Sequence, residues 1–160
     1  MEGHLGELMK RFSASGRVEW IGVRLERHGA VKSLKTSPIE FTGLKDDRRS
    51  TPGKRAVTLI QYEHLPVIAA LANVEEVLPE LLRRNIVVSG INLLALRTTR
   101  FQLGSAVLQG SGLCAPCSRM EAALGEGGYT AMRGHGGITA SVVTPGQIAI
   151  GDIVEPQEPE

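Results

Sequence analysis

Cys114 and Cys117 are the only two cysteines of the chain and the residues best suited to chemistry. They follow the glycine-rich stretch 104–112, whose pattern predicts a strand that runs into a flexible turn. A sulfur nucleophile at the end of a strand suits soft-metal binding or sulfur transfer. Pro116 restricts the backbone in front of Cys117, and Arg119 supplies a positive charge close by.

Four interpretations of this cysteine pair stay open on the residues alone. A structural zinc site needs four ligands, whereas the four histidines of the chain are scattered singly. A thioredoxin-like pair begins a helix in a βαβ unit, whereas the region before Cys114 predicts strands. Two buried, unreactive thiols are the third interpretation. In the fourth, Cys117 is a metal ligand or sulfur carrier, and Cys114 resolves a persulfide or disulfide formed on it.

The composition indicates one globular domain with an aliphatic core. The chain has 160 residues, of which 42% are hydrophobic and only 4% aromatic. A net charge of +1 argues against a protein built around nucleic acid. No apolar run approaches the roughly 20 residues of a membrane span, and residues 1–7 lack a signal-peptide pattern. We therefore expect a cytoplasmic protein with reduced thiols and neither a membrane nor a nucleic-acid partner.

Many short strands and a few helices must position the cysteines. Apolar residues at helical spacing predict helices over 2–12, 62–71, 74–83 and, as a single turn, 121–124. Alternating or β-branched runs predict strands over 17–26, 38–41, 56–60, 86–88, 93–96, 101–103, 106–108, 138–143 and 147–154. The last two strands are expected to pair around the turn 144–146. Because strands and helices do not alternate regularly, a mainly β barrel with helices is favoured over a doubly wound sheet.

The order of the motifs resembles the MOSC family, named for the C-terminal domain of molybdenum-cofactor sulfurases. The resemblance runs from about Gly16 to Glu155. It rests on segments 43–48, 54–60, 83–93, 114–117 and 134–138, with Gly151-Asp152. It implies a closed, Greek-key-like β-barrel (mainly β, α+β) with a few peripheral helices. The expected division is an N-terminal helix or extension over 1–15, a barrel domain over 16–155 and a loose tail over 156–160.

The resemblance also implies which residues form a site for molybdenum cofactor. Cys117 matches the signature cysteine that ligates molybdenum or is proposed to carry a persulfide, so it is the expected catalytic residue and metal ligand. The expected cofactor-binding residues are Lys32, Arg48, Thr58, Arg83, Arg84, Asn85, Asn92, Arg133 and His135. Where the family usually has Gly-Asp-Arg, this chain has Asp46-Asp47-Arg48, and Asp46 lacks the freedom of glycine at positive φ.

Plainer roles for some of these residues are equally typical of the pattern. Arg83 and Arg84 suit the C-terminal dipole of a helix that Asn85 ends. Asn92 suits a turn. The family resemblance favours the functional interpretation.

Two functions follow from the resemblance. The first is cofactor-dependent reduction of N-hydroxylated or related substrates, with an electron donor outside the chain, because no flavin, iron–sulfur or nicotinamide motif is present. The second is a non-catalytic sulfur-carrier domain that holds a persulfide on Cys117 and works with a cysteine desulfurase. The chain has no room for a pyridoxal-phosphate desulfurase domain of its own. A barrel-fold binding partner without a cofactor is a third interpretation.

Overall fold

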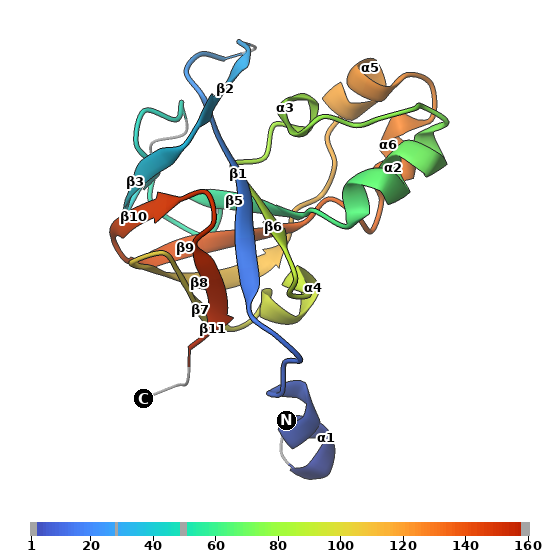
Figure 1. Cartoon of the computed structure of the whole chain (residues 1–160). Coiled ribbons are helices and arrows are strands. Elements are labelled where there is room, and N and C mark those ends of the chain that lie inside the picture. The colour runs from blue at the N-terminus through green and yellow to red at the C-terminus, as the bar shows by residue number, and fades with distance from the viewer. Residues whose placement is uncertain (1–2, 28, 49–50, 158–160) are drawn as a thin grey trace.

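The described part of the chain forms a closed, mixed seven-stranded β-barrel (Figure 1). It comes from a computed structural model, which describes residues 3–27, 29–48 and 51–157. Around the barrel the strands follow the order β1 (Gly16–Arg24), β11 (Ile153–Pro156), β7 (Arg100–Leu103), β8 (Ala106–Leu113), β9 (Ile138–Thr144), β5 (Val57–Gln61) and β6 (Ile86–Ser89). Only the β5–β6 pair is parallel among these. The predicted mainly β barrel is therefore confirmed.

The barrel closes where its first and last strands meet. β1 pairs with β11, with Gly16 opposite Val154 and Arg17 opposite Ile153. A further strand, β2 (Val31–Leu34), lies outside this ring and pairs with β1. A small second sheet contains β10 (Gly146–Ala149), β3 (Thr36–Glu40) and β4 (Gly43–Leu44).

Alternating side chains of the same strands fill both the barrel interior and the layer outside it. Successive side chains of a strand point to opposite faces. In β5, Leu59 packs in the barrel core while its neighbour Ile60 packs in a second cluster. In β6, Val88 faces the barrel core and Val87 the second cluster. These two strands are buried on both faces, which is why their sequences are nearly continuous apolar runs.

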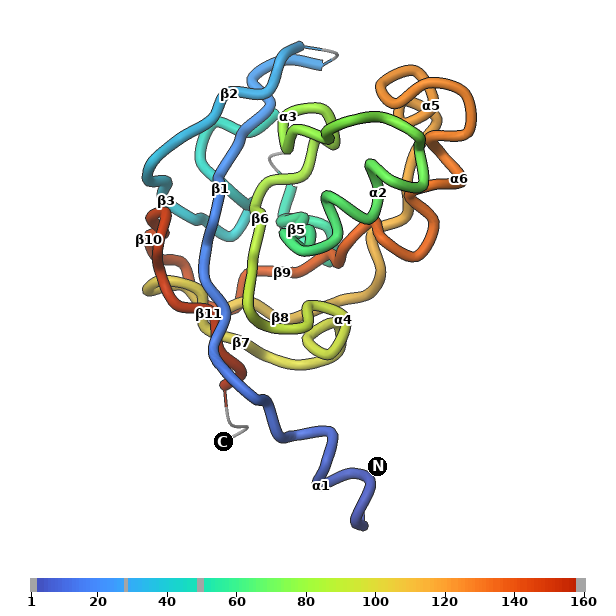
Figure 2. The backbone as a smooth tube through the Cα atoms, turned by 45° about the vertical axis from the view of Figure 1, so that its right-hand side comes forward, coloured from blue at the N-terminus to red at the C-terminus, as the bar shows by residue number. Residues whose placement is uncertain are grey.

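Helices form the second layer on one side of the barrel. They are α2 (His64–Ala72), α3 (Pro79–Leu82), α5 (Arg119–Leu124) and α6 (Gly128–Met132), and Figure 1 shows α2, α5 and α6 grouped beside the strands. The short α4 (Leu93–Leu96) follows β6, whereas α1 (Gly3–Met9) projects away from the barrel (Figure 2). Among the described residues, no helix has the length and apolar character needed to cross a bilayer.

Three local predictions are wrong. Leu93–Leu96 is a helix rather than a strand, because Asn92 caps it by accepting a hydrogen bond from the Leu94 backbone N–H. The expected helix over 74–83 is reduced to Pro79–Leu82, since Pro79 can begin a helix but cannot continue one. The strands after residue 138 do not pair with each other: β9 joins β5 and β8, and β10 joins β3.

Candidate functional site

The two cysteines differ sharply in their surroundings. Cys117 is exposed and lies just before α5, whereas the side chain of Cys114 is buried. Both are free thiols. The Cys114 N–H donates to the Gly137 carbonyl at 2.8 Å, and the Cys117 carbonyl accepts from the Met120 N–H at 2.9 Å. The backbone around the pair is thus held at both ends, and only the Cys117 sulfur is open to a ligand.

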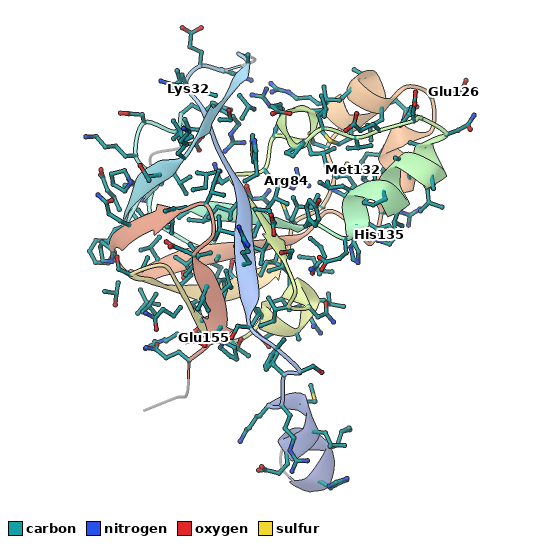
Figure 3. All side chains as sticks on the ribbon, in the orientation of Figure 1. Lys32, Arg84, Glu126, Met132, His135 and Glu155 are labelled. Atoms are coloured by element: carbon teal, nitrogen blue, oxygen red, sulfur yellow. The ribbon has the colours of Figure 1, made fainter. Side chains whose placement is uncertain are left out.

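Arg84 holds the cysteine segment in place through hydrogen bonds to backbone carbonyls. Its buried guanidinium donates to three carbonyls, those of Gly136 at 2.9 Å, Leu82 at 3.0 Å and Ala115 at 3.3 Å. These carbonyls belong to the 134–137 loop, the end of α3 and the cysteine segment. Figure 3 shows Arg84 between the barrel and the helical layer. Gly136 permits this packing, because an added Cβ would lie 2.2 Å from the Cys114 carbonyl oxygen.

Three other arginines lie close enough to Arg83 to act on its charge, and so does Cys117; we call Arg24, Arg48, Arg83 and Arg119 the arginine cluster. Burial and the positive charges of the other three members lower the pKa of Arg83, while Cys117 acts to raise it. The guanidinium still stays protonated, because arginine keeps its charge in proteins. Concentrated positive charge beside an exposed sulfur attracts an anionic ligand.

Arg83 has a costly backbone conformation and an unpaired nitrogen. It ends α3 in the left-handed region with φ of 59°, where a bulky residue is uncommon. One terminal nitrogen, Nη1, donates to the Gly29 carbonyl at 2.8 Å. The other, Nη2, is screened from solvent and has no hydrogen-bond partner in the described part of the protein. A buried N–H without a partner indicates a place for a missing acceptor.

The loop at 46–48 supports the cluster despite its departure from the family pattern. Asp46 adopts φ of 68°, a conformation that aspartate tolerates better than most residues. The turn that glycine would form at position 46 is therefore kept with aspartate there. It directs the buried Asp47 carboxylate to Arg24, which donates from Nη2 to Oδ2 at 3.0 Å and from its backbone N–H to Oδ1 at 2.7 Å. Asp47 thereby neutralises one arginine of the four.

Thr58 and Asn85 face each other inside the wall of the barrel. The Asn85 Oδ1 accepts from the Thr58 N–H at 3.1 Å and from its hydroxyl at 3.2 Å. The Asn85 N–H donates to the Thr58 hydroxyl, and Asn85 Nδ2 donates to the Gly22 carbonyl. Both residues are buried. Their hydrogen bonds hold β5 to β6 directly behind Arg83.

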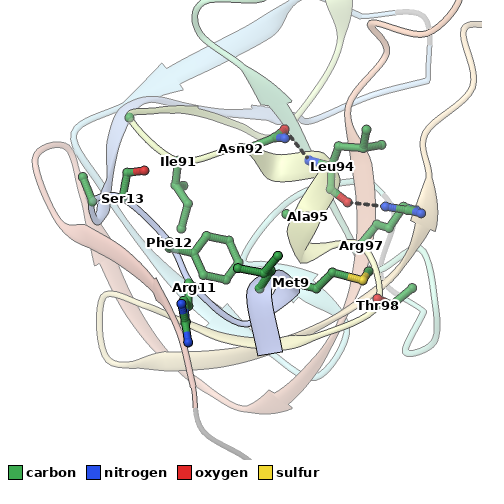
Figure 4. A pocket seen from close by; sticks show the side chains of 13 residues that line it. Met9, Arg11, Phe12, Ser13, Ile91, Asn92, Leu94, Ala95, Arg97 and Thr98 are labelled. Carbon is green, nitrogen blue, oxygen red and sulfur yellow. Dashed lines mark hydrogen bonds between the residues drawn. The ribbon is translucent and has the colours of Figure 1, made fainter. Parts of the chain in front are cut away.

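The remaining predicted residues lie on other parts of the surface. His135 packs edge to face against His64, with ring centres 5.0 Å apart. Asn92 caps α4 and lines two cavities, one of about 230 Å³ beside His64 and one of about 580 Å³ between α1 and α4 (Figure 4). Lys32 is exposed on β2, far from His135 in Figure 3, and Arg133 is exposed at the end of α6.

The structure thus places both Arg48 and Cys117 near Arg83, and Arg84 supports the cysteine segment. Sequence reasoning missed Arg24 and Asp47 as members of the site. Two signals point to them: Arg24 directly follows the apolar run 20–23, and Asp47 lies in a loop rich in basic residues. It also missed His64, which nothing in the sequence links to His135.

The donor set fits molybdenum cofactor. Its dithiolene supplies most of the metal's ligands, so the protein needs one soft ligand and cations for the phosphate. Cys117 is such a ligand, and the unpaired Arg83 nitrogen is such a cation. In the described residues, no group of three or more His, Cys, Asp or Glu side chains could hold a bare metal ion.

Comparisons with solved structures agree on the fold. The YUAD protein from Bacillus subtilis superposes with a TM-score of 0.81 at 19% identity, over 94% of this chain and 100% of that one. YiiM from Escherichia coli gives 0.70 at 18% identity, over 90% and 71%. YiiM from Geobacillus stearothermophilus gives 0.69 at 14% identity, over 89% and 75%. At these identities the likeness establishes the fold alone. No curated protein matches the sequence.

The family model described as "MOSC domain" matches residues 25–155, which is most of the chain and includes the whole cysteine segment. The matched region starts directly after β1 and ends in β11, so it leaves out the first strand of the barrel and contains the other six. The motifs, the barrel and this match agree, and the chain belongs to the MOSC domain family.

Proposed function

We propose that this protein binds molybdenum cofactor through Cys117 and the arginine cluster and serves the reduction of N-hydroxylated substrates. The observation that carries the proposal is the exposed Cys117 sulfur beside Arg83, whose Nη2 is buried without a partner. A thiolate and unpaired guanidinium groups are the two kinds of group that a metal dithiolene with a phosphate requires.

Each residue near Cys117 has a distinct part in this proposal. The Cys117 thiolate is the protein ligand to the metal. Arg83 and Arg48 bind anionic oxygens of the cofactor, whereas the charge of Arg24 is paired with Asp47. Arg84 positions the cysteine segment through its three carbonyl contacts. Thr58 and Asn85 keep β5 and β6 in register behind Arg83.

When bound, the cofactor supplies a redox metal that can pass two electrons to a substrate. In the net reaction an N–OH compound takes up two electrons and two protons, the N–O bond breaks, and an N–H compound and water form. The electrons come from a separate donor protein. The exposed position of Cys117 leaves room for the substrate and this donor to reach the same face.

The test is the molybdenum content of the protein purified from a host that makes the cofactor. We expect close to one molybdenum per chain, with the fluorescence of a pterin after release. Cys117→Ser should remove the metal, whereas Cys114→Ser, at the buried thiol, is the matched control and should retain it. A wild-type protein without molybdenum or pterin would refute the proposal.

The sulfur-carrier function is the second candidate, and the exposure of Cys117 favours it as well. In that function a desulfurase transfers sulfur from cysteine to the Cys117 thiolate as a persulfide. Because Cys114 is buried, it is poorly placed to resolve that persulfide, and the sulfur should survive until an acceptor arrives. Persulfide labelling after incubation with a desulfurase and cysteine, lost in Cys117→Ser only, would support this function.

A further inference from the structure

His64 and His135 lie together, and the function proposed above does not use them. His64 is the first residue of α2, and His135 belongs to the glycine-rich loop before β9. Their ring centres are 5.0 Å apart at an interplanar angle of 86°. Both side chains are half-buried. Residues 71 positions apart in sequence are thus held in contact by the fold.

One nitrogen of this pair has no partner. His135 Nδ1 is screened from solvent, and no hydrogen bond satisfies it in the described part of the chain. An imidazole nitrogen that is buried needs a donor, an acceptor or a metal ion. A cavity of about 230 Å³ is lined by His64 and by Gly134 and Gly137 of the loop that carries His135, although not by His135 itself. A small ligand therefore has room beside the His64 ring.

A fixed negative charge beside the pair favours a cation. Glu63 precedes His64 in the chain, and its carboxylate accepts from Gln61 Nε2 at 2.8 Å and from the Gly90 N–H at 2.9 Å. A carboxylate held in this way stabilises a cation close by.

We propose that His64 and His135 form a binding site for one divalent transition-metal ion, Zn²⁺ or a metal of similar preference, completed by water from the adjacent cavity. Imidazole is a preferred ligand of these metals. Two imidazoles bound to one tetrahedral ion with metal–nitrogen distances of about 2.0–2.1 Å have ring centres roughly 5 Å apart. Since the rings now lie edge to face, at least one must rotate about χ2, a torsion that is broad in histidine.

The test is Zn²⁺ titration of the full-length chain in a Cys117→Ser background, which removes the exposed thiol as a competing ligand. We expect one Zn²⁺ per chain by calorimetry. His64→Ala and His135→Ala should each weaken binding at least tenfold. His4→Ala is the matched control on the exposed helix α1 and should change nothing. An unchanged Zn²⁺ affinity in either ring variant, or no Zn²⁺ binding by the chain at all, overturns the proposal.

A second measurement needs no variant at the site and covers the case in which a ring variant fails to fold. Paramagnetic Co²⁺ broadens the NMR signals of the rings that bind it. We expect the ring signals of His64 and His135 to broaden at substoichiometric Co²⁺, before that of His4. Equal broadening of these rings would show that no such site exists. Because the thiol is absent, neither experiment depends on the function of Cys117.

Discussion

Arg83 and Arg84 are sequence neighbours with opposite surroundings. Arg84 is buried, and its guanidinium is satisfied by three backbone carbonyls. Arg83 is strained at positive φ and keeps one buried nitrogen without a partner among the described residues. Strained residues with unmet hydrogen bonds are typical of functional sites, because stability alone would not select them. The structure thus distinguishes Arg84, which supports the fold, from Arg83, which keeps a nitrogen available for a ligand.

Arg84→Met should destabilise the protein by about 2–4 kcal/mol, because three backbone carbonyls, those of Gly136 and Leu82 in buried surroundings, lose their donor. Urea denaturation measures the free energy of unfolding. Arg100→Met, at an exposed arginine on β7, is the control and should change it by no more than about 0.5 kcal/mol. Equal effects of the two substitutions would mean that the carbonyl contacts of Arg84 do not stabilise the fold.

Arg83→Gly should leave the free energy of unfolding within about 1 kcal/mol of wild type, because relief at positive φ offsets the lost bond to Gly29. It should nevertheless abolish molybdenum retention in the cofactor-producing host. Thermal denaturation and metal analysis of the same sample test both halves. Full retention of molybdenum in the variant would contradict the role given to Arg83.

Sequence reasoning selected residues of the site well but could not rank them. Cys117 and Arg83 were both chosen, and the structure brings them together. Thr58, Arg84 and Asn85 were chosen with the same weight, yet their polar atoms bond within the protein. A sequence pattern does not reveal which polar side chain in a buried strand is already satisfied. Their part in cofactor binding stays a prediction.

At the scale of elements, short apolar runs were the hardest to assign. Leu93–Leu96 has the composition of either a strand or a helix, and the cap at Asn92 decides in favour of the helix. The β-branched runs of β5 and β6 were assigned correctly because both faces are buried and the apolar pattern is continuous. For Leu93–Leu96, a local hydrogen bond and not hydrophobicity thus determines the type of element.

Asn92→Ala should cost about 1 kcal/mol of stability through loss of the α4 cap, whereas Asn92→Asp should keep nearly all of it. Chemical denaturation of the two variants measures the difference. If Asn92 instead acts mainly on the cofactor, both variants would be as stable as wild type and only molybdenum retention would fall.

Glu121 connects α5 to α6 and should make that connection depend on pH. Its carboxylate accepts from the Gly127 N–H at 2.9 Å and the Tyr129 N–H at 3.1 Å. These two bonds lower its pKa below the ordinary value of 4.5. A lowered pKa means that the stabilisation is present above the unfolded value and is lost as pH falls through the folded one.

Wild type should therefore be more stable than Glu121→Gln above about pH 4.5, and the two should converge at lower pH, because glutamine resembles the protonated acid. Thermal denaturation from pH 7 to pH 3 gives the comparison. A difference that stays constant over this range would contradict the linkage.

For the whole molecule, the seam between β1 and β11 holds the barrel closed. Residues 16 and 154 meet there, although they lie near opposite ends of the chain. α1 lies outside the seam and leaves Leu5, Leu8 and Met9 exposed. The predicted boundary between an N-terminal extension and a barrel domain is consistent with this arrangement and stays a prediction.

Deleting residues 1–10 should lower the free energy of unfolding by less than about 1 kcal/mol, because α1 buries little. Deleting residues 152–160 removes β11 and should abolish cooperative unfolding, since it exposes the edges of β1 and β7. Circular dichroism during heating distinguishes the two outcomes. A cooperative transition in the second variant would show that the barrel does not need its last strand.

The pairing of β1 with β11 has a consequence for biosynthesis. On the ribosome the first strand emerges long before its partner, so the barrel cannot close until β11 has left the exit tunnel. Until then the nascent protein presents the unpaired edges of β1 and β7. The thiol of Cys117 has by that time already been synthesised. We expect a stalled chain lacking its final ten residues to be captured by chaperones, and release of the full-length product to coincide with acquisition of protease resistance.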